Sequence, residues 1–334
     1  MKQHFQTANL TLEALTSNNP EMQRCLSLGR EAAKSTLPIL LQGETGTGKT
    51  LLAQAVHNSS PRASGTFVSF NASAMSDTLL ESQLFGHEKG AFTGATSQMR
   101  GKFEVAHQGT LFFDEIADMS PLAQAKILRA VEYGEFERLG SEKTRFAEVR
   151  IISATNQPLR ELAGTGKFRN DLFHRLNGLT LVIPALRKRF EDMPTLIALE
   201  VDICARNAEK TITSIHPEAL FKLTKYSWPG NLRELHRVIQ AIVLFTEGNT
   251  ILPENIYLDG DLFEESSPVV NTEESNTPGT DNSTSVASNS DMSLDAAVRN
   301  HVLHVYNITG KNKRRTAKLL GISRSTLDRK LSEA

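Results

Sequence analysis

The feature that most constrains this chain is the glycine-rich stretch GETGTGKT at residues 43–50, which matches the phosphate-binding pattern G-x-x-x-x-G-K-[ST]. The short apolar run at 37–41 precedes it as a strand would, and the sequence TLLAQAV from residue 50 is compatible with a helix. In such a strand, turn and helix, backbone N–H groups and the helix N-terminus face an anion. The stretch therefore predicts a site for nucleotide phosphates. The alternative is a glycine-rich turn that binds nothing.

Each position of this stretch has an expected role in binding ATP. We expect Gly43, Gly46 and Gly48 to adopt positive φ and to let the backbone approach the phosphates closely. Lys49 would reach the β and γ phosphates, and the Thr50 hydroxyl would bind Mg²⁺. The expected nucleotide-binding residues are Gly43, Glu44, Thr45, Gly46, Thr47, Gly48, Lys49 and Thr50.

A second motif, TLFFDE at residues 110–115, has a buried-strand pattern that ends in two carboxylates. Beside a phosphate-binding loop, an aspartate at such a strand end can hold Mg²⁺, and the adjacent glutamate can orient and deprotonate a water. We therefore assign Asp114 to Mg²⁺ and Glu115 to the role of general base. Taken alone, an acidic pair after a strand is more often a solvated turn, so this assignment depends on the phosphate-binding stretch.

Composition limits the classes of protein that fit. The chain has 334 residues, enough for two domains, and its formal net charge of −1 gives no global attraction to nucleic acid. Its two cysteines, Cys25 and Cys204, match no metal-ligand spacing and suit a reducing compartment. No apolar run approaches the roughly 18 residues of a membrane span, and the N-terminus has no signal-peptide core. We expect a cytoplasmic protein without membrane insertion.

Apolar segments alternate with helical patterns through the first half of the chain. Strands are expected at 37–42, 66–70, 110–114 and 149–154, and an amphipathic helix at 120–133. Such alternation predicts an α/β fold in which helices flank a parallel sheet. From about 189 to 247 the strand signal disappears, and a smaller helical subdomain is expected there.

The C-terminal part of the chain changes character twice. Residues 261–290 contain no Lys or Arg and are rich in Ser, Thr, Asn and Pro, which predicts a flexible linker. Residues 291–334 are basic and predict a helix-turn-helix whose second helix enters the DNA major groove. The alternative is a solvated basic helix. The expected DNA contacts are Lys311, Lys313, Arg314, Ser323, Arg324, Ser325, Thr326, Arg329 and Lys330.

The expected domain organisation follows these changes. Ala317, Leu320, Ile322 and Leu327 would supply the small core that a helix-turn-helix needs. The expected parts are a short N-terminal segment at 1–20, an α/β ATPase subdomain at 21–187, a helical lid subdomain at 188–258, a flexible linker at 259–290 and the helix-turn-helix at 291–334.

Between the two nucleotide motifs lies the segment FGHEKGAFTGA at residues 85–95. Its glycines make a poor helix and a poor strand, so we expect a protruding loop that exposes Phe92 and Thr93. GAFTGA at 90–95, the two ATPase motifs and the C-terminal helix-turn-helix together resemble the bacterial enhancer-binding proteins, the AAA+ activators of RNA polymerase that carries sigma-54. The resemblance covers roughly residues 15–334. It implies sigma-54 contacts by Gly90, Ala91, Phe92, Thr93, Gly94 and Ala95.

The resemblance also implies roles for further polar residues. Asn156 is similar to the sensor I residue that reads the γ-phosphate, and Arg233 to the sensor II arginine of the lid. Arg169 and Arg175 resemble arginine fingers, which would reach the nucleotide of an adjacent subunit. Asn71 matches the residue that restrains the catalytic glutamate. The implied catalytic set is Glu115, Asp114, Asn71, Arg169, Arg175, Asn156 and Arg233. For each arginine alone, the alternative is a surface salt bridge.

The chain departs from the family pattern at several positions. The family often has Glu where this chain has Thr50, whose hydroxyl favours Mg²⁺ ligation. The family often has Cys-Ala after the asparagine, where Asn71 is followed by Ala and Ser. Many relatives begin with a receiver or ligand-sensing domain, whereas residues 1–20 precede the ATPase pattern here. We therefore expect an ATPase that needs no phosphodonor or ligand and is controlled by its abundance or by a regulatory protein acting in trans.

The mechanism that the resemblance implies is mechanical. ATP would bind between the subunits of a homo-oligomeric ring, a hexamer, and hydrolysis would move the 86–97 loop so that it engages sigma-54 and opens the promoter. The helix-turn-helix, as a dimer, would tether the ring to an upstream site on double-stranded DNA. Two alternatives stay open. One is a DNA-binding AAA+ regulator that does not act through sigma-54, which the intact GAFTGA disfavours. The other is an ATP-driven loader or protease unloader, which the helix-turn-helix disfavours.

Overall fold

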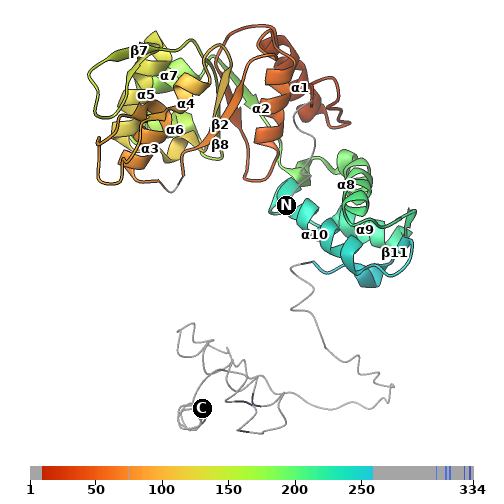
Figure 1. Cartoon of the computed structure of the whole chain (residues 1–334). Helices are drawn as coiled ribbons and strands as arrows, with labels where there is room; N and C mark the ends of the chain where they lie inside the picture. Colours follow the sequence, from red (N-terminus) through yellow and green to blue (C-terminus); the bar gives the residue numbers. More distant parts are fainter. Residues whose placement is uncertain are drawn as a thin grey trace, which may run out of the picture. The chain divides into compact units, whose positions relative to one another are not determined.

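The computed structural model describes residues 10–73 and 75–258, together with Tyr306, Lys313, Thr316, Leu327 and Leu331 (Figure 1). The chain forms two units, Met1–Ser267 and Pro268–Ala334, and each is described by itself. Within the described residues, no helix is both long enough and apolar enough to cross a membrane.

Five parallel strands form the central sheet of the first unit. Their spatial order is β2 (Phe67–Asn71), β5 (Thr110–Asp114), β8 (Arg150–Thr155), β1 (Ile39–Gln42) and β9 (Leu179–Val182). All four strands expected from the sequence are confirmed, with bounds that differ by one or two residues at most. The sequence does not predict β9, because this edge strand is short and only Leu181 within it is buried.

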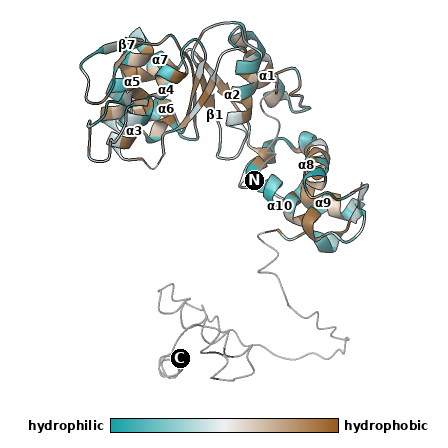
Figure 2. Cartoon of the chain, in the orientation of Figure 1, coloured by the Kyte–Doolittle hydropathy of each residue, from teal (hydrophilic) through white to brown (hydrophobic). Residues whose placement is uncertain are grey.

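Helices cover both faces of this sheet (Figure 1). α1 (Pro20–Ala33) and α2 (Lys49–Asn58) lie on one face. The other face carries α3 (Asp77–Phe85), α4 (Lys102–Val105), α5 (Pro121–Tyr133), α6 (Leu159–Gly164) and α7 (Asn170–Leu176). Successive strand residues point to opposite faces, so Leu41 joins the core with Leu52 while Leu40 joins the core with Leu172. The strands between the helices are strongly hydrophobic (Figure 2), as expected for a sheet buried on both faces. The predicted α/β fold is confirmed.

A helical lid follows the sheet in the same unit. It contains α8 (Met193–Asn207), α9 (Pro217–Lys225) and α10 (Asn231–Phe245). Trp228 is 1% exposed in its core, and the indole N–H donates to the Leu223 carbonyl at 2.9 Å. The expected helical lid is confirmed, and it also contains one pair of very short strands. β10 (Ser214–Ile215) and β11 (Thr250–Ile251) form a parallel pair, and strands of two residues are too short to leave a periodic signal.

Shorter elements complete the first unit. Single 3₁₀ turns lie at Ile116–Asp118, Leu186–Lys188, Phe190–Asp192 and Pro253–Asn255. β3 (Gly86–His87) pairs antiparallel with β4 (Met99–Arg100), and β6 (Glu135–Glu137) with β7 (Thr144–Phe146). The first pair encloses residues 88–98, so the loop expected from the glycines of this region is confirmed and rises from a hairpin base.

Asp192 ties the segment before α1 to the start of the lid. Its carboxylate accepts hydrogen bonds from Ser17 Oγ and Asn18 N, both at 2.6 Å, and from Arg189 Nε at 2.9 Å. Burial alone would raise the pKa of this carboxyl, but these donors and the Arg189 charge hold the pKa below its usual range. The lid is therefore fastened at its first turn to a part of the chain that precedes the sheet.

The second unit is described at five helical residues. Thr316 and Leu327 are fully buried, and Lys313 is exposed. Burial of Leu327 agrees with its expected place in a small core, and exposure of Lys313 agrees with its expected place on a basic surface. The other predicted residues of this unit lie outside the described residues: Lys311, Arg314, Ala317, Leu320, Ile322, Ser323, Arg324, Ser325, Thr326, Arg329 and Lys330.

Candidate nucleotide-binding site

The predicted phosphate-binding loop connects β1 to α2. Gly48 caps α2 with a φ of 98°, and Gly46 has a φ of 81°, both in the left-handed region that favours glycine. The expectation of a positive φ at Gly43 is wrong. At Gly43 the missing side chain matters instead, because a Cβ atom there would lie 2.9 Å from the Ile183 carbonyl oxygen. Gly43 thus allows the loop to pass close to Ile183, the residue after the end of β9.

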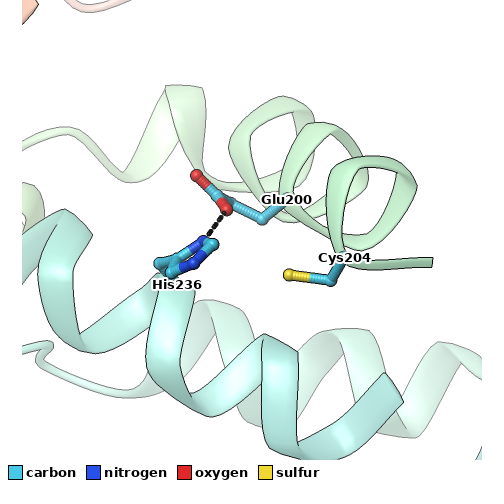
Figure 3. A group of neighbouring side chains, drawn as sticks. All are labelled: Glu200, Cys204 and His236. Carbon is cyan, nitrogen blue, oxygen red and sulfur yellow. Dashed lines mark hydrogen bonds and ion pairs between the residues drawn. The ribbon is translucent and has the colours of Figure 1, made fainter. Parts of the chain in front are cut away.

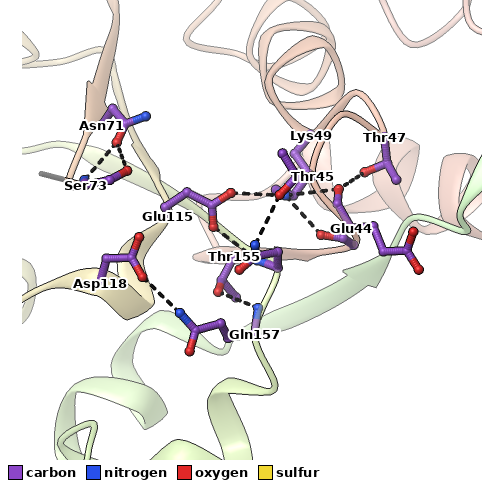
Figure 4. Close-up of polar contacts among 12 residues, drawn as sticks. Glu44, Thr45, Thr47, Lys49, Asn71, Ser73, Glu115, Asp118, Thr155 and Gln157 are labelled. Atoms are coloured by element: carbon purple, nitrogen blue, oxygen red, sulfur yellow. Dashed lines mark hydrogen bonds and ion pairs between the residues drawn. The ribbon is translucent and has the colours of Figure 1, made fainter. Parts of the chain in front are cut away.

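Lys49 lies at the first position of α2 and is 6% exposed. Its Nζ donates to the carbonyls of Gly43 at 2.9 Å and Glu44 at 3.3 Å, and lies 3.5 Å from Glu115 Oε1 (Figure 4). The ammonium group is therefore held within the loop, where it can neutralise phosphates bound to the backbone N–H groups. Thr50 follows on the same helical turn with an exposed side chain.

Thr47 has its side chain turned into the loop. It is 4% exposed, and its hydroxyl donates to the Glu44 carbonyl at 2.8 Å. The side chain therefore closes the turn of the loop between Glu44 and Thr47. Glu44 and Thr45 present their side chains to the lid and to the end of β8, as described below.

The two carboxylates of Asp114 and Glu115 lie beside the loop, where β5 ends. Burial and the adjacent charge of Glu115 raise the pKa of the Asp114 carboxyl, against the opposing charges of Lys49 and Arg233. Two carboxylates next to one buried ammonium leave an excess of negative charge. A divalent cation would offset that excess, and the oxygens of Asp114 and Thr50 are ligands of the kind that Mg²⁺ prefers. The residues present fit the ion.

Glu115 is oriented by the end of β8. Its backbone has a φ of 52°, in the left-handed region, and its Oε2 accepts a hydrogen bond from Asn156 N at 3.2 Å. The Asn156 side chain donates through Nδ2 to Thr45 Oγ1 at 3.1 Å. The structure therefore brings together the predicted general base, the predicted sensor I residue and the phosphate-binding loop.

Asn71 does not make the contact expected of it. It lies beside Asp114 in the register of β2 and β5, but its Oδ1 accepts hydrogen bonds from Ser73 N at 2.8 Å and Ser73 Oγ at 2.5 Å (Figure 4). Among the described residues, no hydrogen bond joins Asn71 to Glu115. Ser73 thus occupies the Oδ1 acceptor of Asn71, and the contacts that hold Glu115 here come from Lys49 and from the Asn156 N–H.

The lid contacts the loop through residues that the sequence analysis missed. Asn231 is fully buried, accepts a hydrogen bond from Leu186 N at 2.7 Å, and donates to the Thr45 carbonyl at 3.0 Å and to Glu44 Oε2 at 3.3 Å. Arg187 forms a forked ion pair with Glu44, with N···O distances of 2.7 and 2.5 Å, which holds the pKa of Glu44 below its usual range.

The predicted sensor II residue lies beside this contact. Arg233 is exposed on the first turn of α10. It lies close to the loop, because a Cβ atom added at Gly46 would be 3.2 Å from the Arg233 Cβ. The residue before it, Leu232, donates a backbone hydrogen bond from its N–H to the Gly46 carbonyl at 2.9 Å. The sequence feature that could have pointed to Asn231 is Trp-Pro-Gly-Asn at residues 228–231. Asn231 takes a φ of 53° there, a conformation that asparagine tolerates better than most residues.

The two predicted arginine fingers lie apart from this site. Arg169 pairs with Asp171 at 2.7 Å, Arg175 pairs with Glu132, and all four side chains are partly exposed. Both arginines belong to the segment around α7, on the face of the sheet opposite α2 (Figure 1). Neither has a contact with the phosphate-binding loop of its own chain among the described interactions.

The loop at 88–98 stands on a network of charges. The buried guanidinium of Arg138 donates to Glu88 at 3.0 Å and to Glu104 at 2.7 Å, and it holds the pKa of Glu88 low. Within GAFTGA, Thr93 and Gly94 are exposed and Ala95 is buried. The expectation that Phe92 is exposed is wrong, because its half-buried ring packs edge-on against His87 at a centroid distance of 5.1 Å.

Gly90 and Gly94 give the loop its shape. Their φ values are 83° and 105°, and a Cβ atom at either would meet nothing within 4 Å. The backbone at these positions is therefore strained for any other residue although the space is open. Ala91 faces the second hairpin, since a Cβ atom at Gly140 would lie 2.8 Å from the Ala91 Cβ.

Comparison with protein-family models finds three matches along the chain. Residues 15–182 match the sigma-54 interaction domain, and residues 187–269 match the AAA+ ATPase lid domain. Residues 309–333 match the bacterial regulatory proteins of the Fis family. The matches follow one another in the order of the sheet, the lid and the C-terminal unit.

Individual relatives and structures give the same result. The chain is 38% identical over 317 residues to the phenol regulator MopR of Acinetobacter guillouiae, covering 93% of this chain and 54% of that protein. It is 39% identical over 326 residues to the DNA-binding transcriptional regulator NtrC of Salmonella typhimurium, covering 94% and 68%. NtrX from Brucella abortus, solved in complex with ATP, has 31% identity and a TM-score of 0.68, covering 96% and 68%. The chain thus spans about half the length of the phenol regulator and about two thirds of the other two.

Proposed function

The chain belongs to the family of sigma-54 activators with an AAA+ ATPase fold, and we propose that it hydrolyses ATP to remodel RNA polymerase that carries sigma-54. The resemblance drawn from GAFTGA and from the two nucleotide motifs is confirmed by this membership. The proposal rests on two features that occur together in the first unit. One is a buried Lys49 paired with Glu115, and the other is a glycine-shaped loop at 88–98 on a charged hairpin base.

The proposed hydrolysis uses the residues at the strand ends. Lys49 would neutralise the β and γ phosphates. Thr50 and Asp114 would hold Mg²⁺, which when bound would offset the charge of the phosphates. Phosphates that attract the Lys49 ammonium also free the Glu115 carboxylate from its ion pair at 3.5 Å. Glu115 then accepts a proton from the attacking water, with its carboxylate oriented by the Asn156 N–H. ATP binding and activation of the base are thereby linked.

The proposed assembly is a ring of identical chains, a hexamer by family resemblance. Arg169 and Arg175 are partly exposed and lie apart from the loop of their own chain, which supports a role at the nucleotide of the adjacent subunit. Arg233 would read the same nucleotide from the lid. Asn71 would restrain Glu115 through its Nδ2 donor, because Ser73 uses only its Oδ1 acceptor.

Residues 90–95 form the proposed contact with sigma-54. Thr93 and Gly94 are exposed at the tip, and Phe92 has to leave the His87 ring to present its full surface to a partner. The C-terminal unit is proposed to bind upstream enhancer DNA as a dimer and to raise the concentration of the ring at the promoter. We place the protein in the cytoplasm, where its partners lie, with regulation by a second protein acting in trans.

An open-complex assay with purified components tests this function. The chain, sigma-54 polymerase and promoter DNA should give open complexes with ATP and none with a non-hydrolysable analogue, because the loop moves only on turnover. The same protein should not change opening by a polymerase that carries the ordinary sigma factor. Opening that proceeds with the analogue would contradict a mechanical role, and an effect confined to the ordinary polymerase would favour a DNA-binding regulator that does not use sigma-54.

A further inference from the structure

Three side chains that bind metals meet in the lid, outside the nucleotide site. Glu200 and Cys204 lie four residues apart on α8, and His236 lies on α10, which packs against it (Figure 3). One ligand atom from each residue lies within 4.8 Å of the other two. The sequence showed no metal-ligand spacing around Cys204, because the histidine comes from a helix that only the fold brings close.

The surroundings of this cluster suit a thiolate metal. Glu200 is 5% exposed and Cys204 is 3% exposed, and the cysteine packs in the lid core with Val201 and Ile239. The His236 side chain is 30% exposed, which leaves a path from solvent to the cluster. The cluster is thus packed against apolar residues on one side and reaches solvent on the other. Metal sites with three protein ligands and one bound water have such surroundings.

A hydrogen bond already joins two of the three residues. His236 Nδ1 lies 2.8 Å from Glu200 Oε2, and this contact alone can hold α8 against α10. It does not account for the thiol, because a buried methyl-sized group would fill the core equally well at position 204. The sulfur adds a third and softer donor to the carboxylate and imidazole, and that combination separates zinc-class ions from Mg²⁺ and Ca²⁺.

We propose that Glu200, Cys204 and His236 bind a zinc-class divalent metal ion, with the fourth position open to water on the His236 side. On binding, the S–H bond of Cys204 breaks, the sulfur donates its electron pair to the metal, and the proton passes to solvent. His236 donates a ring nitrogen in its neutral form, and Glu200 donates a carboxylate oxygen. The metal thus replaces the direct hydrogen bond between the helices with bonds to both.

Metal at this site would stiffen the lid at a place that reaches the nucleotide loop. α10 begins at Asn231, one and a half helical turns before His236, and Asn231 holds the Thr45 carbonyl. A link between α8 and α10 therefore reduces the freedom of the helix that contacts the loop. This site is independent of the proposed action on sigma-54, and its test needs neither ATP nor polymerase.

Cobalt titration of the untagged full chain tests the site. Co²⁺ takes the place of Zn²⁺ in such sites, and its bond to a thiolate gives a charge-transfer absorption band in the near ultraviolet. Wild type should show this band with a single equivalent of Co²⁺, and added Zn²⁺ should remove it. Cys204→Ser, which keeps the side-chain volume, should lose the band. Cys25→Ser removes the other buried cysteine and should keep it.

Zinc affinity, measured by competition with a chelating indicator, gives the magnitude. Loss of an outer partner of a metal ligand already costs tenfold to a hundredfold, so loss of a direct ligand in Cys204→Ser or His236→Gln should lower affinity by more than about a hundredfold. His236→Gln lies on the exposed side of the cluster and serves if Cys204→Ser does not fold. A wild type without the band, a band that survives in Cys204→Ser, or His236→Gln with wild-type zinc affinity would overturn the proposal.

Discussion

Replacement of Asn231 should loosen the contact between the lid and the phosphate-binding loop. The fully buried side chain accepts a hydrogen bond from Leu186 N and donates to the Thr45 carbonyl and to Glu44 Oε2. Without it, the Leu186 N–H is buried unpaired, at a cost of about 1–3 kcal/mol, and each of the other two bonds contributes about 1 kcal/mol. We expect the free energy of unfolding of the first unit to fall by about 3–5 kcal/mol.

The backbone at Asn231 adds a cost that a second variant separates. Its φ is 53°, where alanine is strained by about 1–2 kcal/mol and glycine is not. Asn231→Gly therefore measures the hydrogen bonds, and Asn231→Ala measures the same loss with the strain added. Asn231→Asp keeps an acceptor for Leu186 N, removes both donors and places a carboxylate beside Glu44. The aspartate variant should keep the lid folded and weaken its hold on the loop.

Urea unfolding and steady-state ATP hydrolysis measure these effects. Asn231→Ala should be less stable than Asn231→Gly, and Asn231→Asp should raise the KM for ATP about tenfold for every 1.4 kcal/mol of lost binding. Asn207→Asp, at the exposed end of α8, is the matched control and should leave both quantities unchanged. An alanine variant as stable as wild type, or an aspartate variant with wild-type KM, would refute the assignment of Asn231 as the link.

Further predictions concern catalysis, DNA binding and acid stability. Lys49→Ala should abolish binding of a fluorescent ATP analogue, whereas Glu115→Gln should bind it and stop hydrolysis; turnover at the wild-type rate in Glu115→Gln would refute the base. Arg175→Ala subunits should be inactive alone and recover part of their turnover when mixed with Lys49→Ala subunits, and no recovery in assembled rings would count against a role in trans. Arg324→Ala should cost roughly 1–3 kcal/mol of DNA affinity and relax sequence preference in footprints, and an unchanged preference would contradict base contact. Because the folded-state pKa of Asp192 is held below its unfolded value of about 3.9, its contribution to stability is present above that pH and lost as pH falls through the folded pKa. Asp192→Asn should flatten this acid-side loss in a pH series of unfolding midpoints, and an unchanged slope would exclude the carboxylate as its source.

The sheet and the phosphate-binding loop were predictable because their signals are local. Strands buried on both faces are continuous apolar runs. Asp114 and Glu115 follow such a run directly, and Lys49 follows another across the glycine-rich loop. β9 escaped prediction because an edge strand with one buried residue has no such run. The two-residue strands of the lid are set by the packing around them and not by their own composition.

Contacts between distant segments could not be read from the sequence. Asn231 meets the Thr45 carbonyl only because the lid folds back on the loop, and Cys204 meets His236 only because α8 and α10 pack together. Asn71 was expected to hold Glu115 because its position matched the family pattern. Ser73, two residues later, donates to the Oδ1 atom of Asn71, a contact that is visible only when the side chains are placed.

In the proposed mechanism, ATP turnover is converted into promoter opening through the exposed tip of the 88–98 loop. Thr93→Ala tests it most directly, because Thr93 is exposed and makes no contact with the nucleotide site among the described interactions. Open-complex formation and phosphate release are measured together in the same reactions with sigma-54 polymerase. Thr93→Ala is expected to hydrolyse ATP at the wild-type rate and to open no promoter. A variant that opens promoters as well as wild type would contradict it.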